Sequence, residues 1–411
     1  MTARESAYVL AGTVITDGTA RPDSVVAVLG ERIVYAGPRS GFDASDLPDA
    51  EEVALPDGSS ILPGLVDLHC HGAAGGDFPA GDDGGCRTAV DYLHRNGTTT
   101  LLASLVTASP EDLLGAVRTL KRLAEEGLIA GIHSEGPFLS HARCGAQNPA
   151  WLRDPDPELL RQLLQEAGGW LKTMTYAPEL PGADDLVRML IEHGVTPSLG
   201  HTDADASVAA ASLEAAAAGL ASLEGRAARP TVTHLFNGMP PMHHRKPGPL
   251  ASCLRLAGAG TVAVELVADG VHLAPETVQM VFQLVGAHNV VLVTDSMAAA
   301  GLPDGDYALG RSAVSVQAGM ATLQSTGTLA GGTSTLLDVV RRTIEAGVSP
   351  TEAVASATCV PARVLGLETE IGSLRAGMRA DLVVVDQDFG LVAVMRSGAV
   401  ISGMGILSDT K

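Results

Sequence analysis

Eight apolar, β-branched runs recur between Ile61 and Thr294, and amphipathic segments separate most of them. Alternation of this kind is typical of parallel βα units. We expect strands at Ile61–Leu68, Thr98–Val106, Leu128–Ser134, Leu171–Ala177, Val195–Gly200, Thr231–Leu235, Thr261–Val267 and Val290–Thr294. We expect helices among them at Pro110–Glu126, Pro157–Ala167, Ala183–His193, Ala206–Ala218 and Pro275–Val285.

Eight such strands close most economically into an α/β fold of the (β/α)8 TIM-barrel type. The alternative is an open, doubly wound sheet. Its dinucleotide-binding form carries a GxGxxG turn after the first strand, and the sequence after Leu68 has no such turn. We therefore predict the barrel.

The two ends of the chain predict a second, smaller unit. Tyr8–Val53 contains short β-like runs between Gly, Asp and Pro turns, and Gly377–Asp386 and Val392–Ile401 return to the same pattern. We expect both ends to form one small β-sandwich domain, with residues 1–60 and 367–411 flanking a barrel of residues 61–366. A hairpin insertion at Tyr307–Leu323 and helices at Ser334–Ala346 and Thr351–Leu365 complete the expected barrel region.

Charge and composition exclude several functions. The net charge of −20 and the 3% aromatic content disfavour nucleic-acid binding, because the average field repels phosphates and few rings are present for base stacking. No apolar run reaches the roughly 18 residues of a membrane span, and the N-terminus lacks a signal-like apolar core. The five cysteines are scattered and odd in number, which indicates free thiols. We expect a cytoplasmic protein without membrane or nucleic-acid partners.

Candidate metal ligands follow the predicted strands at their C-terminal ends, where barrels carry their chemistry. His69 and His71 are two residues apart, so they face the same side of one strand. A lone pair of histidines two residues apart can also occur by chance and serve only in packing. This alternative is less favoured here because other strand ends also supply side chains of the kind that bind metals. These are Glu135, His201, His234, His272 and Asp295.

Imidazoles combined with carboxylates suit zinc, iron, cobalt or manganese better than calcium or magnesium. We expect Glu135, His201 and His234 to form one site, and His69 and His71 to hold a second ion bridged by Glu135. Asp295, beside a metal-activated water, is the expected general acid and base. A helix N-cap is its alternative role.

Three further features have both a functional and an ordinary interpretation. The basic run His243–Lys246 suits phosphate recognition, or is a solvated loop. The glycine-rich stretch Gly327–Gly332 offers backbone groups to an anion or sugar hydroxyl, or is a flexible turn. Cys144 lies near Glu135 in sequence and is either a metal-capping thiolate or an ordinary free thiol.

Together the motifs DLHCHG, HSEGPF, SLGH, THLFNGM, DGVH, VTDSM and GTLAGG resemble the N-acetylglucosamine-6-phosphate deacetylase family of the amidohydrolase superfamily. The resemblance runs from about Leu62 to Asp386. It implies one or two divalent ions, zinc first, on the ligands above and Asp295 as general acid/base. It further implies a phosphorylated amino-sugar substrate and a homodimer in which Arg245 reaches the partner's ligand. The substrate contacts that it implies are Ala146, Gln147, Asn237, Gly238, His272, Thr328, Leu329 and Ala330.

Two positions depart from that family's pattern. The family usually has a Gly-Ala-His run where this chain has Gly145-Ala146-Gln147. In Gln147 a neutral amide therefore replaces a histidine that is expected to hydrogen-bond the acetyl carbonyl. Gly238 replaces the alanine of FNAM. The expected function is metal-dependent deacetylation of N-acetylglucosamine 6-phosphate. The alternatives are another amidohydrolase, acting on an N-acyl amino acid or cyclic amide, and a catalytically silent barrel that serves as an assembly partner.

Overall fold

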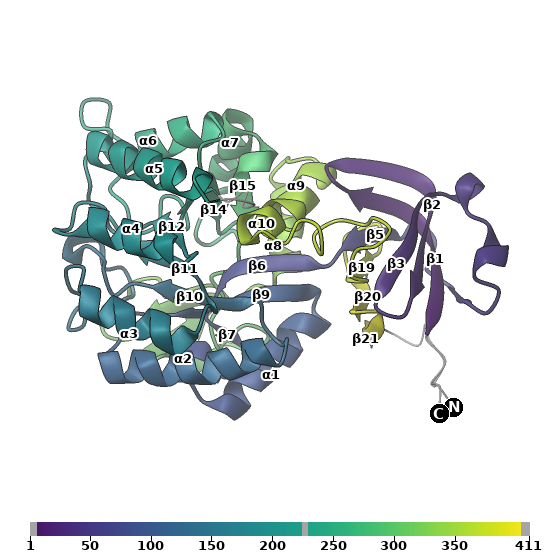
Figure 1. The fold of residues 1–411 in the computed structure, drawn as a ribbon, viewed down its shortest axis with the longest axis horizontal. Coiled ribbons are helices and arrows are strands. Elements are labelled where there is room, and N and C mark those ends of the chain that lie inside the picture. Colours follow the sequence, from purple (N-terminus) through teal and green to yellow (C-terminus); the bar gives the residue numbers. More distant parts are fainter. Residues whose placement is uncertain (1–5, 224–228, 404–411) are drawn as a thin grey trace.

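A computed structural model describes residues 6–223 and 229–403, and its larger part is the predicted barrel (Figure 1). Eight parallel strands pair in the spatial order β15-β14-β13-β12-β11-β10-β9-β6. Going along the chain, they are β6 (Leu65–Cys70), β9 (Thr98–Leu105), β10 (Gly131–Glu135), β11 (Leu171–Tyr176), β12 (Thr196–Leu199), β13 (Thr231–Val232), β14 (Ala263–Leu266) and β15 (Val290–Leu292).

The residues that follow β15 come back against β6 and nearly close this sheet. The Asp295 amide donates to the His69 carbonyl oxygen at 2.8 Å, and the His71 amide donates to the Ser296 carbonyl oxygen at 2.6 Å. The Thr294 hydroxyl donates to the buried Asp67 carboxylate at 2.6 Å. The first and last strands of the barrel therefore meet where His69, His71 and Asp295 lie.

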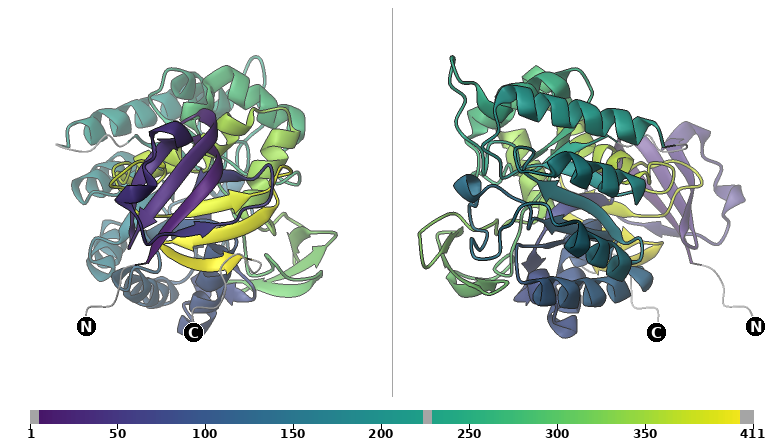
Figure 2. Two further views of the ribbon diagram at one scale, coloured as in Figure 1. Left: turned by 90° about the vertical axis from the view of Figure 1, so that its right-hand side faces the viewer. Right: turned by 60° about the vertical axis from the view of Figure 1, so that its left-hand side comes forward.

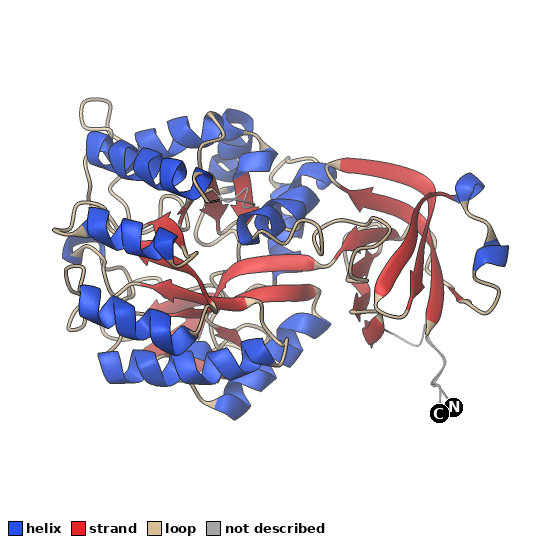
Figure 3. Ribbon diagram, in the orientation of Figure 1, coloured by secondary structure: helices blue, strands red, loops and turns tan. Residues whose placement is uncertain are grey.

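Helices surround the barrel strands on their outer side (Figure 3). Each turns its apolar residues toward the sheet, as α2 does with Leu113, Val117 and Leu120. The helices that follow the strands are α1 (Asp83–Arg95), α2 (Pro110–Glu125), α3 (Pro157–Ala167), α4 (Ala183–Glu192), α5 (Ala206–Ala221), α6 (Gly248–Gly258), α7 (Pro275–Val285), α8 (Leu336–Glu345), α9 (Pro350–Ser356) and α10 (Cys359–Leu365). In the described part of the chain, none of the helices combines the length and apolarity needed to cross a bilayer.

Both chain ends build the smaller unit, as predicted. Strands from the start and the end of the chain lie side by side in one sheet of order β21-β20-β19-β5-β1-β2-β3, with β4 also paired to β1 (Figure 2). The strands are β1 (Ala7–Thr16), β2 (Thr19–Leu29), β3 (Arg32–Pro38), β4 (Glu51–Val53), β5 (Ser60–Pro63), β19 (Leu382–Val385), β20 (Leu391–Arg396) and β21 (Ala399–Gly403).

This sheet curls onto itself. The Ile33 amide in β3 donates to the Met378 carbonyl oxygen, just before β19, at 2.9 Å. Leu10 and Val26 from one half share a core with Leu382 and Val384 from the other half. Burial of these apolar side chains holds the two halves together.

Several elements differ from the sequence prediction. The expected strand Ile61–Leu68 is divided, because β5 joins the small sheet and β6 the barrel. The expected helix Thr351–Leu365 is two helices, since Thr358 between them has non-helical angles (φ −134°, ψ −87°). The expected hairpin is a three-stranded sheet of β16 (Gly305–Leu309), β17 (Ser312–Gln317) and β18 (Met320–Leu323). Helices α1 and α6 were not predicted.

Gly64, between β5 and β6, sits where the two units touch. A Cβ atom there would lie 2.0 Å from the Thr99 hydroxyl oxygen and 2.9 Å from the Asp381 Cβ atom. We expect Gly64→Ala to lower the free energy of unfolding by about 1 to 3 kcal/mol through overpacking. Urea denaturation measures the change.

Gly115, inside α2, is the matched control for Gly64. An added Cβ at Gly115 meets no atom within 4 Å. Gly115→Ala should therefore leave stability unchanged or raise it by up to about 1 kcal/mol, as alanine favours helix. Equal effects of the two substitutions would show that the Gly64 contact is not tight.

Candidate metal centre

The side chains predicted to bind metal converge at one end of the barrel. His69 and His71 lie in or just after β6, Glu135 ends β10, and His201 and His234 follow β12 and β13 within two residues. All are buried, as is Asp295 beyond β15. Together with neighbouring loops, His71, Glu135, His201, His234 and Asp295 line a cavity of about 150 Å³, which we call the metal cavity.

Glu135 joins the first pair of imidazoles. Its Oε1 atom lies 2.8 Å from His201 Nε2 and 2.8 Å from His234 Nε2. The two Nε2 atoms are 3.2 Å apart. This donor set is the one expected from the sequence for the first metal site.

The other oxygen of Glu135 faces the histidine pair of β6. His71 Nε2 lies 3.3 Å from Glu135 Oε2 and 3.2 Å from Asp295 Oδ1. His69 Nε2 lies 3.1 Å from His71 Nε2 and 3.4 Å from Asp295 Oδ1. Glu135 therefore stands between two groups of ligand atoms, as a bridging carboxylate would.

The pKa shifts of the cluster show that its buried carboxylates are stabilised by positive charge nearby. Burial disfavours the imidazolium of His71, but hydrogen bonds to Asp295 and Glu135 outweigh burial and raise its pKa to about 10. Burial alone would raise the pKa of Glu135, but the charge and hydrogen bond of His201, with further hydrogen bonds from His234 and His71, hold it well below its usual range. The charges of His69 and His71 likewise hold the pKa of Asp295 below its ordinary value against burial.

A divalent cation supplies that charge while the imidazoles stay neutral and turn their lone pairs inward. Within the described part of the chain, three groups of side chains have ligand atoms within 4.8 Å of one another, and all three belong to this cluster. The residues present thus fit a divalent metal ion.

Hydrogen-bond partners that the sequence analysis did not predict hold these imidazoles in their orientation. Glu265, in β14 and only 1% exposed, has Oε2 3.2 Å from His69 Nδ1 and accepts the His234 amide at 3.3 Å. His71 Nδ1 lies 3.2 Å from the Ser104 carbonyl oxygen, and His201 Nδ1 lies 2.8 Å from that of Arg143. With Nδ1 donating to an oxygen, each ring presents Nε2 to the cluster.

Three residues of the cluster have unusual backbone angles. His201, His234 and Asp295 have φ values of 46°, 25° and 47°, in the left-handed region that non-glycine residues rarely occupy. Such conformations cost free energy and persist at functional sites where the surroundings impose them. Gly238 (φ 62°) packs against the same site, and a Cβ atom on it would lie 2.8 Å from His201 Nδ1.

Known proteins share this architecture and much of the sequence. The model of the amidohydrolase family matches residues 60–404. The chain belongs to the amidohydrolase family. The N-acetylglucosamine-6-phosphate deacetylase of Bacillus subtilis is 36% identical, with 85% of this chain and 87% of that protein aligned. The N-acetylgalactosamine-6-phosphate deacetylase of Escherichia coli O157:H7 is 31% identical over 88% of this chain and 93% of its own length.

A solved structure is similar over nearly the whole chain. It is a variant of the N-acetyl-D-glucosamine-6-phosphate deacetylase of Mycobacterium smegmatis in complex with N-acetyl-D-glucosamine-6-phosphate. The sequence identity is 38%, the TM-score is 0.87, and 97% of this chain and 100% of that chain are covered. The barrel with its terminal sheet is therefore the fold of this amidohydrolase.

Most of the residues expected to contact substrate line the metal cavity of this amidohydrolase. They are Ala146, Gln147, Asn237, Gly238, His272, Thr328 and Leu329. Ala330 does not line it: the residue is fully buried and its amide donates to the Ala321 carbonyl oxygen at 3.0 Å, while Gly331 lines the cavity instead. Arg245 is exposed and lies outside the residues that line the cavity.

Gln147 and His272 are both held in place. The Gln147 amide nitrogen donates to Glu135 Oε2 at 2.5 Å, and its oxygen accepts the Thr107 amide at 2.7 Å. His272 Nδ1 lies 2.8 Å from Asp269 Oδ2, which leaves its Nε2 facing Asp295 at 3.8 Å. Gln147 thus contacts a predicted metal ligand, an arrangement that the sequence comparison with histidine did not suggest.

Cys144 lies outside the three ligand groups. Its sulfur is 3.8 Å from the Gly145 carbonyl oxygen, on the loop that lines the metal cavity. In this structure the thiol is therefore not placed as a metal ligand, and the capping role stays a prediction.

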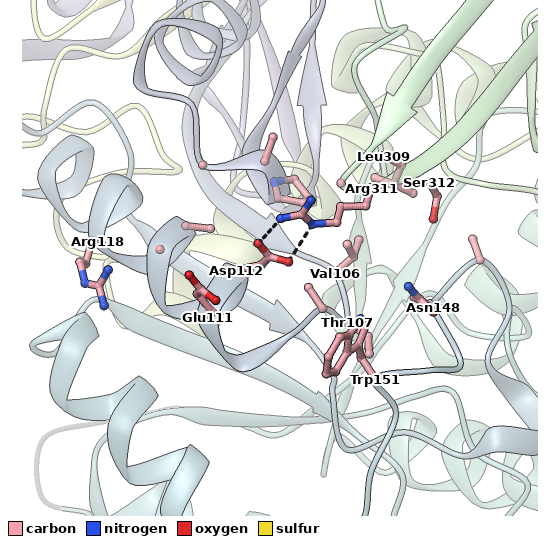
Figure 4. Close-up of a pocket in the computed structure, with 18 residues that line it drawn as sticks. Val106, Thr107, Glu111, Asp112, Arg118, Asn148, Trp151, Leu309, Arg311 and Ser312 are labelled. Atoms are coloured by element: carbon pink, nitrogen blue, oxygen red, sulfur yellow. Dashed lines mark hydrogen bonds and ion pairs between the residues drawn. The ribbon is translucent and has the colours of Figure 1, made fainter.

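A larger cavity of about 580 Å³ adjoins the metal cavity and shares Ala146 and Leu309 with it (Figure 4). Two of its charged side chains pair with each other, since Arg311 donates to Asp112 through bonds of 2.8 and 2.6 Å. Its lining residues, all in the described part of the chain, include neither histidine nor cysteine. The candidate chemistry of this amidohydrolase thus belongs to the smaller cavity.

The two ligand groups should be separable by mutation. We expect His69→Ala combined with His71→Ala to lower metal content from about two ions per chain toward one, with measurable activity left, because Glu135, His201 and His234 remain. Elemental analysis of purified protein measures this. His133, buried nearby but hydrogen-bonded to Ser104 and Thr175, is the control, and its replacement by Gln should keep metal content. An unchanged metal content in the double variant would contradict the second site.

Proposed function

We propose that this amidohydrolase removes the acetyl group from N-acetylglucosamine 6-phosphate, giving glucosamine 6-phosphate and acetate. One observation carries the proposal: the cluster of Glu135, His201, His234 and Asp295 lines a cavity in a chain that is similar along most of its length to deacetylases of that substrate.

Glu135, His201 and His234 would hold one divalent ion, and His69, His71 and Glu135 a second. We infer zinc, with iron, cobalt or manganese as the alternatives that suit the same ligands. A bound ion of this kind lowers the pKa of water and polarises an acyl carbonyl.

We assign the proton transfers to Asp295. Its carboxylate lies within 3.4 Å of both His69 and His71, and the cluster keeps it ionised. As the water oxygen bonds to the acetyl carbon, Asp295 accepts the proton of that water. It then donates the proton to the amide nitrogen as the C–N bond breaks, so that the amine leaves neutral.

The remaining lining residues position the sugar and its acyl group. His272 turns its Nε2 toward the reacting centre. Burial lowers the pKa of His272, but the hydrogen bond and charge of Asp269 raise it overall, so the Nε2–H of its imidazolium form or the amide of Gln147 can stabilise the oxyanion. Asn237, the backbone at Gly238 and Ala146, and the backbone at Thr328 and Leu329 are the proposed contacts to the sugar hydroxyls and the phosphate side.

We also propose that the active enzyme is a homodimer in which Arg245 binds the 6-phosphate held by the partner subunit. Arg245 follows the cavity residues Asn237 and Gly238 by a few positions, yet its side chain is exposed rather than in the cavity of its own chain. Arginine suits phosphate through its two-pronged donor geometry.

The N-acetylgalactosamine 6-phosphate epimer is the second candidate substrate, because a relative of similar identity acts on it. Steady-state rates on both phosphorylated sugars, on N-acetylglucosamine and on an N-acetyl amino acid test the proposal. We expect the highest kcat/KM for N-acetylglucosamine 6-phosphate. A higher kcat/KM for N-acetylgalactosamine 6-phosphate would favour the second candidate. A higher kcat/KM for the N-acetyl amino acid would exclude both candidates.

A further inference from the structure

A separate cavity lies at the opposite end of the barrel from the metal cavity. It has a volume of about 240 Å³ and is lined from β9, β11, the loop before β10, the loop after α10 and the small sheet. Thr99 and Thr100 at the start of β9 line it, whereas Ser104 near the end of β9 contacts His71. Thr100 and Ser104 are four residues apart in β9, roughly 13 Å along the strand, and the two cavities share no lining residue.

The charge of this cavity opposes that of the whole chain. Its lining residues include Lys172, Arg379 and Arg396 and no acidic residue, in a protein of net charge −20. We call it the basic cavity. The carboxylate of Asp381 is engaged by Arg379 through Oδ2 and by the Ser397 amide through Oδ1. The lining of the basic cavity thus carries three cationic side chains and no acidic one.

Arg396, at the end of β20, is held without an ion pair to any described residue. Its Nε donates to the Thr99 carbonyl oxygen at 3.0 Å, and its Nη2 donates to that of Gly127 at 2.5 Å. Its Nη1 makes no hydrogen bond to residues 6–223 or 229–403. Burial and the positive charge of Arg379 lower the pKa of this guanidinium, so a nearby anion would stabilise its charged form.

Arg379 and Lys172 complete the cationic lining from two different units. Arg379, just before β19, uses Nε for Asp381 and Nη2 for Asp381 and the Thr100 hydroxyl, and its Nη1 has no bond to a described residue. Lys172 belongs to the barrel strand β11; its ammonium donates to the Gly169 carbonyl oxygen at 2.9 Å and lies 5.2 Å from the centre of the Trp170 ring. Thr99, also lining the cavity, is buried with an unpaired hydroxyl.

We propose that the basic cavity binds a small oxyanion of the phosphate class. Arg379 and Arg396 can each donate through Nη1, and Lys172 adds a third cation to the lining. Such groups form the charge-assisted contacts that phosphate oxygens favour. Because the arginines come from the small sheet and Lys172 from the barrel, the bound anion joins the two units. Binding to the folded state then raises its stability by mass action.

Inorganic phosphate is the probe, and thermal unfolding of the metal-loaded full chain is the measurement. Phosphate should raise Tm in a saturable way beyond sodium chloride at equal ionic strength. Lys172→Gln removes one charge and should weaken the apparent affinity at least tenfold, while deacetylation rates stay unchanged. Lys121→Gln, on the outer surface at α2, is the matched control and should bind phosphate as the unmodified protein does.

Two further variants test whether misfolding or phosphate binding at another site could explain the result. Arg396→Lys keeps the positive charge but loses the two-pronged donor geometry of the guanidinium, so its apparent affinity for phosphate should also fall at least tenfold. Arg245→Ala should leave this Tm response intact, which separates it from phosphate binding at the proposed substrate site. The proposal is wrong if phosphate acts no more strongly than chloride. It is equally wrong if Lys172→Gln and Arg396→Lys both keep the affinity of the unmodified protein.

Discussion

Asp295→Asn is expected to lower kcat by about 10² to 10⁴-fold, because proton transfer by a positioned side chain typically contributes that much and Asp295 acts twice. The amide of asparagine has nearly the same shape but cannot accept the proton of water. Steady-state kinetics on N-acetylglucosamine 6-phosphate measures the loss.

Metal content provides the control for Asp295→Asn. Asp295 lies within 3.4 Å of His69 and His71, so its replacement could also disturb the second ion. The loss of kcat should persist in samples whose metal content equals that of the unmodified protein. A loss below about tenfold at equal metal content would remove Asp295 from the proton-transfer role.

Arg245→Ala is expected to lower kcat/KM for the phosphorylated sugar by roughly 10 to 150-fold, the cost of one charge-assisted phosphate contact. The unphosphorylated sugar should hardly be affected, so the variant should lose the preference between the two. Arg255→Ala, an exposed arginine of α6 that pairs with Glu214, is the matched control and should change neither rate. Equal losses on both sugars would assign Arg245 a structural role.

Mixing two variants that are both impaired on the phosphorylated sugar tests where Arg245 acts. If the enzyme is the proposed dimer, hybrids of Arg245→Ala and Asp295→Asn chains contain one site with an intact Asp295 and an intact Arg245 from the other chain. Activity should therefore return on mixing if Arg245 crosses the interface. A selective loss on the phosphorylated sugar without recovery, after subunit exchange is verified, would place Arg245 in the site of its own chain.

The barrel and the convergence of the candidate ligands at one end of it were predictable because both depend on strand periodicity. Apolar runs locate the strands, and ligands just after them meet at one end of any parallel barrel. Elements with weak local signals were missed. Helix α1 begins with Asp83 followed by two glycines, and α6 begins with Gly248 and Pro249, residues typical of turns. The division at Gly64 depends on contacts with Thr99 and Asp381, which are distant in sequence.

The orienting residues of the site were harder to predict than its ligands. Glu265 lies inside a short barrel strand, and a carboxylate buried there needs a partner, which is the signal that could have identified it. The direction of the Gln147 amide toward Glu135 and the exclusion of Ala330 from the metal cavity depend on loop geometry. Sequence spacing does not determine such geometry.

Metal removal and restoration tests the central claim most directly. Acetate release from N-acetylglucosamine 6-phosphate should be followed for the purified protein, after treatment with a chelator, and during titration with zinc, with bound metal measured in each sample. The account predicts that acetate and amine form in equal amounts, that chelation abolishes the activity, and that activity returns in proportion to bound metal. Full activity in metal-free protein, or no acetate release from fully loaded protein, would contradict it.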